Sequence, residues 1–288
     1  MLDSKEIPDG NIPGLDLLAA HRALLEQAVD HFQDDDRVVG MILGGSLARG
    51  GADFYSDVDL YIVTCDESFG AVFDGSDAAA LALGPPLFRF IVDPTPGGSQ
   101  DYIVTYPGPV KLDLMYYRES EIVPAPKWAG CVVLKDVSGL VDDVLIRSRD
   151  FAPSPPASDE LLELDQWFWT LCWYVFGKVM RGELWEALDG IHTIRSDALL
   201  PMLDWAAGRP HEGFRRLEVK LDPGTAGRLR DTVAALEAGT LYDALQAAMA
   251  LFCDLRGPLF ELRSLTFDSS QGEELRDEMD RRWASRGA

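Results

Sequence analysis

The chain has 288 residues, of which 47% are hydrophobic and 26% charged, and its formal net charge is −22. A chain of this length and composition can bury a sizeable core and is expected to form two domains. The acidic charge argues against binding to nucleic acids, whose phosphates require lysine and arginine; it either attracts cationic molecules or serves only solubility.

The first half of the sequence alternates between helical and strand-like patterns. Apolar residues between positions 17 and 32 recur at helical spacing, and further helices are expected at 67–83 and 141–148. Short apolar runs predict strands at 38–43, 58–63, 87–92, 101–106, 110–117 and 132–134. The turn Pro107-Gly108-Pro109 is expected to join two of these runs into a hairpin.

A proline-rich segment at 151–158 separates the two halves, because prolines so closely spaced cannot continue a regular element. We therefore expect one domain at 1–150 and a second at 151–288. Ser158 is expected to cap a helix whose apolar residues between 161 and 179 step by three and four. Similar patterns follow to the end of the chain, so the second domain is predicted to be an all-α helical bundle.

The cysteines and the apolar segments indicate the cellular compartment of the protein. Its four cysteines lie far apart with no Cys-x-x-Cys pair, which predicts free thiols in a reducing cytoplasm. The densest apolar stretch, 167–176, falls short of the roughly 18 residues that a membrane helix needs. The start, Met1–Asn11, lacks the pattern of a secretory signal. We expect a cytoplasmic monomer or homodimer without membrane contact.

Two aspartates in the third apolar segment carry the main chemical signal. Asp57 and Asp59 alternate with Val58 and Leu60, so a strand would place both carboxylates on one face with backbones about 6.6 Å apart. Their side chains can then converge on two divalent cations about 3.5–4 Å apart. Carboxylate oxygens suit Mg²⁺, whose charge would also offset their mutual repulsion. The alternative is a pair of acids on the solvated face of an edge strand.

A glycine-rich bend precedes these acids. Gly44 and Gly45 end the preceding strand, where backbone N–H groups can approach a triphosphate without an intervening side chain. Ser46 can add its hydroxyl to this contact. Arg49 either contacts phosphate or is an exposed arginine in a short helical turn.

A third acid, Asp113, stands alone inside an apolar run. Burying an unpaired carboxylate is costly, so a function at this position is favoured over chance. In the functional interpretation Asp113 binds the catalytic metal and helps to deprotonate an attacking hydroxyl, directly or through the metal. In the alternative it lies on an exposed strand face.

Taken together, Gly45-Ser46, the Asp57-x-Asp59 pair and Asp113 resemble the polymerase-beta-type nucleotidyltransferase superfamily over residues 38–117. The resemblance implies an α/β (α+β) catalytic domain with a mixed sheet and two Mg²⁺ ions. It also implies in-line attack on the α-phosphorus of a nucleoside triphosphate, with release of pyrophosphate.

The second half is similar, more loosely, to the helical domain of aminoglycoside adenylyltransferases of the streptomycin-modifying type, and lincosamide nucleotidyltransferases share that architecture. The similarity lies at 174–184, 187, 194–195 and 199–205. It implies that Lys178 and Arg181 contact phosphates. It also implies that Glu183, Glu186 and Asp189 bind cationic amines of the substrate, with ordinary helix-surface acids as the alternative.

The favoured function is transfer of AMP from ATP to a hydroxyl of a small molecule, for which an aminoglycoside fits the acidic composition best. Lincosamides, an unknown metabolite, a protein or an RNA are alternative acceptors, although the acidic charge argues against RNA. A non-catalytic nucleotide-binding regulatory module is a further alternative. The presence of Asp57, Asp59 and Asp113 together argues against it.

Overall fold

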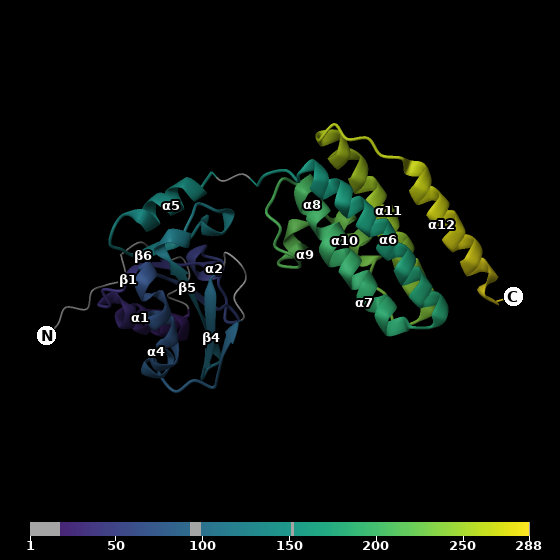
Figure 1. The fold of residues 1–288 in the computed structure, drawn as a ribbon. Coiled ribbons are helices and arrows are strands. Elements are labelled where there is room, and N and C mark those ends of the chain that lie inside the picture. The colour runs from purple at the N-terminus through teal and green to yellow at the C-terminus, as the bar shows by residue number, and fades with distance from the viewer. Residues whose placement is uncertain (1–17, 93–98, 151–152, 288) are drawn as a thin grey trace. The chain divides into compact units, whose positions relative to one another are not determined.

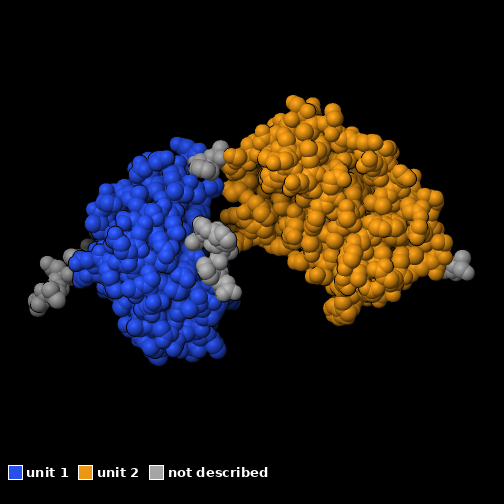
Figure 2. Space-filling view, in the orientation of Figure 1, with its two compact units in different colours: residues 1–151 blue, residues 152–288 orange. Residues whose placement is uncertain are grey.

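The computed structural model describes residues 18–92, 99–150 and 153–287. The chain divides into two compact units, Met1–Phe151 and Ala152–Ala288 (Figure 2). Each unit has its own hydrophobic core. Residues 151 and 152 of the expected linker lie outside the described residues.

Unit 1 is built on a mixed sheet of six strands in the order β3-β4-β5-β2-β1-β6 (Figure 1). The strands are β1 Val38–Leu43, β2 Val58–Thr64, β3 Phe88–Val92, β4 Gln100–Tyr106, β5 Val110–Arg118 and β6 Val132–Asp136. The pair β2–β5 is parallel and the other neighbours are antiparallel. The expected hairpin, β4–β5, is confirmed, and so is the strand expected at 132–134, which forms an edge of the sheet as β6.

Hydrophobic layers cover both faces of this sheet. The helices of unit 1 are α1 Ala19–Gln33, α2 Gly45–Ala48, α3 Phe69–Asp74, α4 Ser76–Ala82 and α5 Leu140–Ser148. One core joins α1, α3 and α4 to the face that carries Leu60 and Ile62. A smaller core joins α5 to the face that carries Ile42 and Val63, with Tyr61 packed against it. Alternate residues of β2 therefore serve opposite faces of the sheet.

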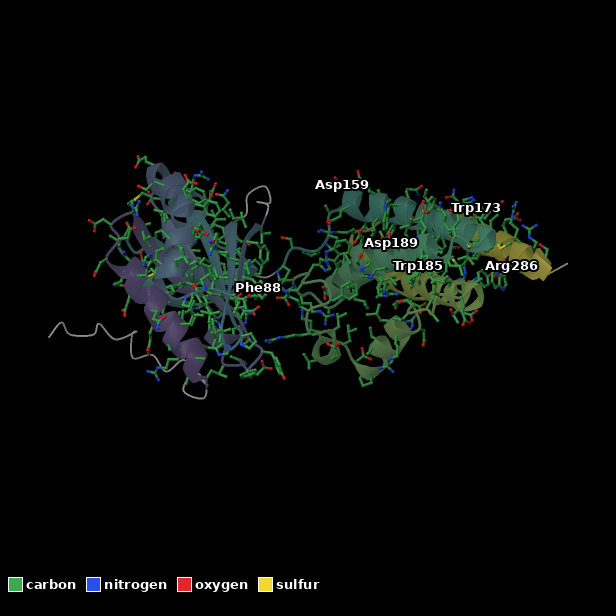
Figure 3. The ribbon with its side chains drawn as sticks, turned by 90° about the horizontal axis from the view of Figure 1, so that it is seen from below. Phe88, Asp159, Trp173, Trp185, Asp189 and Arg286 are labelled. Carbon is green, nitrogen blue, oxygen red and sulfur yellow. The ribbon has the colours of Figure 1, made fainter. Side chains whose placement is uncertain are left out.

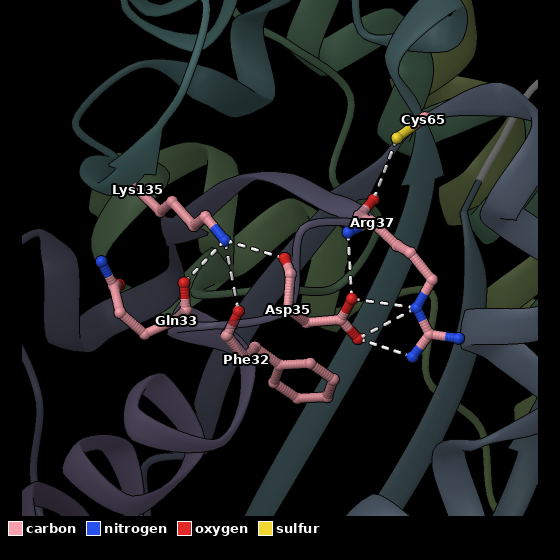
Figure 4. Close-up of polar contacts among 6 residues, drawn as sticks. All are labelled: Phe32, Gln33, Asp35, Arg37, Cys65 and Lys135. Atoms are coloured by element: carbon pink, nitrogen blue, oxygen red, sulfur yellow. Dashed lines mark hydrogen bonds and ion pairs between the residues drawn. The ribbon is translucent and has the colours of Figure 1, made fainter.

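A lysine on β6 fixes the end of α1 against the sheet. Lys135 Nζ donates to the backbone oxygens of Gln33 at 2.8 Å and Asp35 at 3.0 Å, and it also reaches that of Phe32 (Figure 4). These carbonyls belong to the C-terminal end of the helix or follow it, where partners within the helix are absent and a cation is favourable. Lys135 thus ties α1 to the edge of the sheet.

The helix expected at 67–83 is wrong as a single element. A 3₁₀ turn at Asp66–Ser68 leads into α3, and α3 and α4 are separate helices. Gly75 lies between them, and the Ser76 hydroxyl donates to the Phe73 carbonyl at 2.5 Å. This side-chain bond competes with the regular helical pattern, so the chain bends there.

Every regular element that the structure describes in unit 2 is a helix. They are α6 Ser158–Arg181, α7 Leu184–Ile194, a π-helical segment Arg195–Leu199, α8 Leu200–Ala206, α9 Leu217–Lys220, α10 Pro223–Arg230, α11 Ala238–Leu262 and α12 Ser269–Ala284, followed by the 3₁₀ turn Ser285–Gly287. The helices α6, α7 and α11 pack against one another. Between α6 and α11, Phe168 stacks on Phe252 and buried Asp165 pairs with Arg256 at 2.5 Å.

The start of α6 differs from expectation in one detail. Ala157, rather than Ser158, is the N-cap residue. The carboxylate of Glu160 accepts a hydrogen bond from the Ala157 N–H at 3.1 Å, which satisfies a donor at the helix start.

All four cysteines are free thiols. None of the helices in the described part of the chain is both long and apolar enough to span a lipid bilayer.

Candidate active site

The parallel pairing of β2 with β5 places two of the predicted acids side by side. Asp59 is the register partner of Asp113, and Val58 is the partner of Leu112. The strand expected at 58–63 begins at Val58 as predicted, so Asp57, which was expected to share a strand face with Asp59, lies just before β2. Asp57 is therefore the last residue of the loop before β2, next to the first paired position of the strand.

Hydrogen bonds fix the turn that carries Asp57. The Ser56 N–H donates to the Asp53 carbonyl at 3.0 Å, and the Ser56 hydroxyl accepts from the Asp53 N–H at 2.8 Å. His21 is buried in α1, and its Nε2 lies 2.8 Å from the Ser56 carbonyl oxygen. Asp57 therefore follows a segment that is held by its own hydrogen bonds and by a helix far away in the sequence.

The glycine bend lies directly against Asp59. Gly45 has φ +64°, and a Cβ added there would lie 1.7 Å from Asp59 Oδ2. The Gly44 N–H donates to the Asp59 carbonyl oxygen at 2.9 Å. Only glycine combines this left-handed backbone with so close a carboxylate. The bend and the acid therefore form one unit.

Lys111 lies between two of the predicted metal-binding acids. Its Nζ is 2.8 Å from Asp57 Oδ2 and 3.2 Å from Asp113 Oδ2. Burial alone would lower the pKa of Lys111, but the two carboxylates raise it above its usual value. An ammonium group thus joins carboxylates that the sequence assigned to magnesium.

Asp113 is the most buried acid of this group. Its side chain is 16% exposed, and its Oδ1 is buried without a hydrogen-bond partner. Burial raises the pKa of Asp113, Lys111 opposes that rise, and Asp57 and Asp101 add to it. Asp101 lies on β4 two residues from Ile103, which pairs with Asp113, so period two places Asp101 and Ile103 on one face. Asp101 also has a buried oxygen without a partner.

The residues of this group suit a hard divalent cation. Oxygen ligands from carboxylates are those that Mg²⁺ prefers, and the unpaired buried oxygen of Asp113 is available for one. Within the described residues, however, no three His, Cys, Asp or Glu side chains are already gathered in a way that could hold a metal ion. With Lys111 pairing with Asp57 and Asp113, the carboxylates are arranged around an amine.

Ser46 and Arg49 lie at either end of the short helix that follows the bend. Ser46 is half-buried in α2. Arg49 is the exposed residue that ends α2, and a Cβ added at Gly130 would lie 3.1 Å from its Cγ. The stem of Arg49 therefore lies beside the loop before β6.

In unit 2, four of the predicted site residues belong to one ionic network with Tyr174. Lys178 pairs with Glu183 at 2.7 Å and with Glu186 at 3.1 Å, and Arg181 pairs with Glu183 at 2.6 Å. The Tyr174 hydroxyl donates to Glu186. Hydrogen bonds from Lys178 and Arg181 lower the pKa of Glu183, and those from Tyr174 and Lys178 lower that of Glu186. The charges of these groups already offset one another.

Asp189, the remaining predicted substrate-binding acid, is exposed on α7 (Figure 3). A separate cavity of 810 Å³ in unit 2 collects further acids and aromatic rings. Its lining includes Asp159, Glu160, Glu163, Asp197, Trp167 and Trp205. In the part of the chain that the structure describes, these four acids are without ion-pair partners.

Several of these residues escaped the sequence prediction. Lys111 had a visible signal, since Lys-x-Asp at period two places both side chains on one strand face. Asp101 carried the same kind of signal, as an acid at the start of a hairpin strand. The contact of His21 with Ser56 spans 35 positions and left no pattern in the sequence.

The profile of the streptomycin adenylyltransferase family matches residues 20–277 of the chain. A search of curated proteins gives no significant match.

Two solved structures are similar to the chain at low identity. An aminoglycoside 6-adenyltransferase from Bacillus subtilis is 15% identical, with 90% of this chain and 97% of that chain covered and a TM-score of 0.44. A nucleotidyltransferase-like protein from Exiguobacterium sibiricum 255-15 is 14% identical, with 84% and 79% covered and a TM-score of 0.41.

We predict that Gly45→Ala disturbs both stability and the position of Asp59. The left-handed backbone at Gly45 should cost an alanine about 1–2 kcal/mol of unfolding free energy, and its Cβ would collide with the Asp59 carboxylate. Urea denaturation measures the first effect, and Mg²⁺-dependent nucleotide binding measures the second. Gly51→Ala is the matched control, because no atom lies within 4 Å of a Cβ added there. Equal stability and equal binding in the two variants would contradict the prediction.

Proposed function

The chain belongs to the streptomycin adenylyltransferase family, and on that premise we propose that it transfers AMP from ATP to a hydroxyl group of an aminoglycoside-type antibiotic. As a member of this family the protein is a nucleotidyltransferase. The observation that supports the proposed reaction best is Asp113, whose buried and unpaired oxygen lies on the strand beside Asp59. A buried carboxylate with a free oxygen is suited to bind a cation or to accept a proton.

We assign Asp57, Asp59 and Asp113 to two Mg²⁺ ions. When bound, Mg²⁺ would supply the positive charge that offsets the charge developing on the triphosphate. The Gly44-Gly45 bend and the Ser46 hydroxyl would bind phosphate oxygens, because the backbone there is not covered by side chains. Arg49 would add a charged contact if its head group turns toward the phosphates.

In the proposed reaction the acceptor oxygen forms a bond to the α-phosphorus of ATP. The bond from that phosphorus to the oxygen bridging to the β-phosphorus breaks, and pyrophosphate leaves with this oxygen. The proton of the acceptor hydroxyl goes to a carboxylate, for which Asp113 is suited because burial raises its pKa. Positioning of the two substrates would supply much of the rate enhancement.

The acidic cavity of unit 2 supports a cationic acceptor. Acids without cationic partners attract protonated amines, and tryptophan rings such as Trp167 and Trp205 provide flat surfaces for sugar rings or cations. The acids of α7 predicted from the sequence, Glu183 and Glu186, are already paired, and only Asp189 has no such partner among the described residues. We therefore place the recognition of substrate amines mainly in this cavity.

The two units would then have different roles in the reaction. Residues 1–150 would form the nucleotidyltransferase catalytic domain, and residues 151–288 the helical substrate-binding domain. Lys178 and Arg181 would contact phosphates only after release from Glu183. The free cysteines fit a reducing cytoplasm, where ATP is available.

We predict that the protein releases pyrophosphate from ATP and Mg²⁺ only when an aminoglycoside acceptor is present. Asp57→Asn and Asp113→Asn should each lower kcat by a hundredfold or more, because removing a charged metal ligand costs roughly several kcal/mol of transition-state stabilisation. A coupled pyrophosphate assay over aminoglycosides and lincosamides measures both effects.

Asp74→Asn, at the exposed end of α3, is the control for this assay and should leave kcat unchanged. Absence of pyrophosphate release with every acceptor, despite metal-dependent ATP binding, would reject the antibiotic as substrate. Full activity of Asp57→Asn would reject the assigned metal ligands.

We also predict that the cavity acids set the affinity for the acceptor. Glu163→Gln and Asp197→Asn should each raise KM for a cationic aminoglycoside about tenfold, because each removes one hydrogen bond between charged groups. Neither substitution should change KM for ATP. Glu186→Gln should raise it less, because Lys178 already pairs with Glu186. Steady-state kinetics with Glu261→Gln as the surface control provides the comparison. A larger effect of Glu186→Gln would instead place the acceptor on α7.

A further inference from the structure

The ammonium group of Lys111 lies beside Asp57 and Asp113, where the pairing of β2 with β5 brings acidic side chains together. In the parallel register Leu112 is level with Val58, so Lys111 is level with Asp57, while Asp113 is level with Asp59. Lys111 and Asp113 are two residues apart on one strand and share a face. The lysine is therefore held at the acids by the backbone register.

The contacts of Lys111 are those of a bridge. Its Nζ reaches one oxygen of Asp57 at 2.8 Å and one oxygen of Asp113 at 3.2 Å. The side chain is 36% exposed, whereas that of Asp113 is only 16% exposed. A positive group is needed here, since carboxylates so close together repel one another when both are charged.

We propose that Lys111 is a positioning residue that bridges Asp57 and Asp113 in the metal-free enzyme and competes with the metal ion for them. This proposal rests on the proposed function, because it takes these acids to be metal ligands.

The chemistry of lysine supports an exchange of this kind. Its ammonium is a compact charge on a flexible four-carbon stem, so it can leave the carboxylates without a change in the backbone. A metal ion that binds Asp57 and Asp113 must displace it. The displaced ammonium would then be free to pair with an oxygen of the incoming triphosphate, and metal and nucleotide would bind cooperatively.

Two consequences separate this role from that of an ordinary surface ion pair. Without nucleotide, metal binding to the wild type is weakened by the cost of displacing Lys111, so removing the lysine should strengthen it. When nucleotide is bound, the displaced ammonium gains a phosphate partner. Nucleotide should therefore tighten metal binding less in a variant without the lysine than in the wild type. A merely structural ion pair predicts neither change.

The experiment is Mn²⁺ titration followed by electron paramagnetic resonance of the free ion, with the full-length chain and without nucleotide. For Lys111→Met we expect the dissociation constant for Mn²⁺ to fall about two- to fivefold, the range expected for loss of one partly exposed ion pair. Lys111→Arg keeps the positive charge and should not show this gain. Lys220→Met, which breaks the ion pair with Glu212 in unit 2, is the control for a change of net charge.

A second titration contains a non-hydrolysable ATP analogue. The analogue should tighten Mn²⁺ binding less in Lys111→Met than in the wild type. Should Lys111→Met fail to fold, as judged by circular dichroism, Lys111→Gln serves as the variant.

Unchanged or weaker nucleotide-free Mn²⁺ binding in the neutral variant would overturn the role of Lys111. That outcome differs from failure of the metal site itself, in which the wild type and Asp57→Asn would bind Mn²⁺ equally with the ATP analogue present.

Discussion

The parallel pairing of β2 with β5 is the constraint on which the candidate site depends. This pairing places Asp59 beside Asp113 and brings Lys111 level with Asp57. Hydrophobic cores on the two faces of the sheet hold the strands in that register, because a slip by one residue would turn every side chain to the opposite face. The acids can therefore lie close together and be partly buried, because the apolar residues of the two strands hold the register for them.

Charge compensation is a common theme of both units. In unit 1, Lys111 pairs with two acids that would otherwise repel one another, and in unit 2, Lys178 and Arg181 together offset the charges of Glu183 and Glu186. The acids lining the cavity of unit 2 stand apart, because no cation pairs with them in the part of the chain that the structure describes. With a formal net charge of −22, the chain has negative charge to spare for metal ions and for a cationic substrate.

Much of unit 1 could be predicted from the sequence because its strands are short apolar runs, most of them buried by helices, although every residue of β3 is exposed. The glycine bend and the aspartates could also be recognised in the sequence, because they interrupt or border these apolar runs. What failed depended on contacts distant in sequence or on local competition. Gly75 and Ser76 broke an expected helix. The turn at Gly182 (φ +74°) places Glu183 within reach of Lys178, which no helical pattern predicted.

The assignment of the metal ligands is tested most directly by the position of the metal in crystals grown with Mn²⁺ and a non-hydrolysable ATP analogue, read from anomalous diffraction. We predict Mn²⁺ bound by Asp57, Asp59 and Asp113, with the ammonium of Lys111 moved from these carboxylates to a phosphate oxygen. Mn²⁺ bound elsewhere, with Lys111 still bridging Asp57 and Asp113, would contradict it.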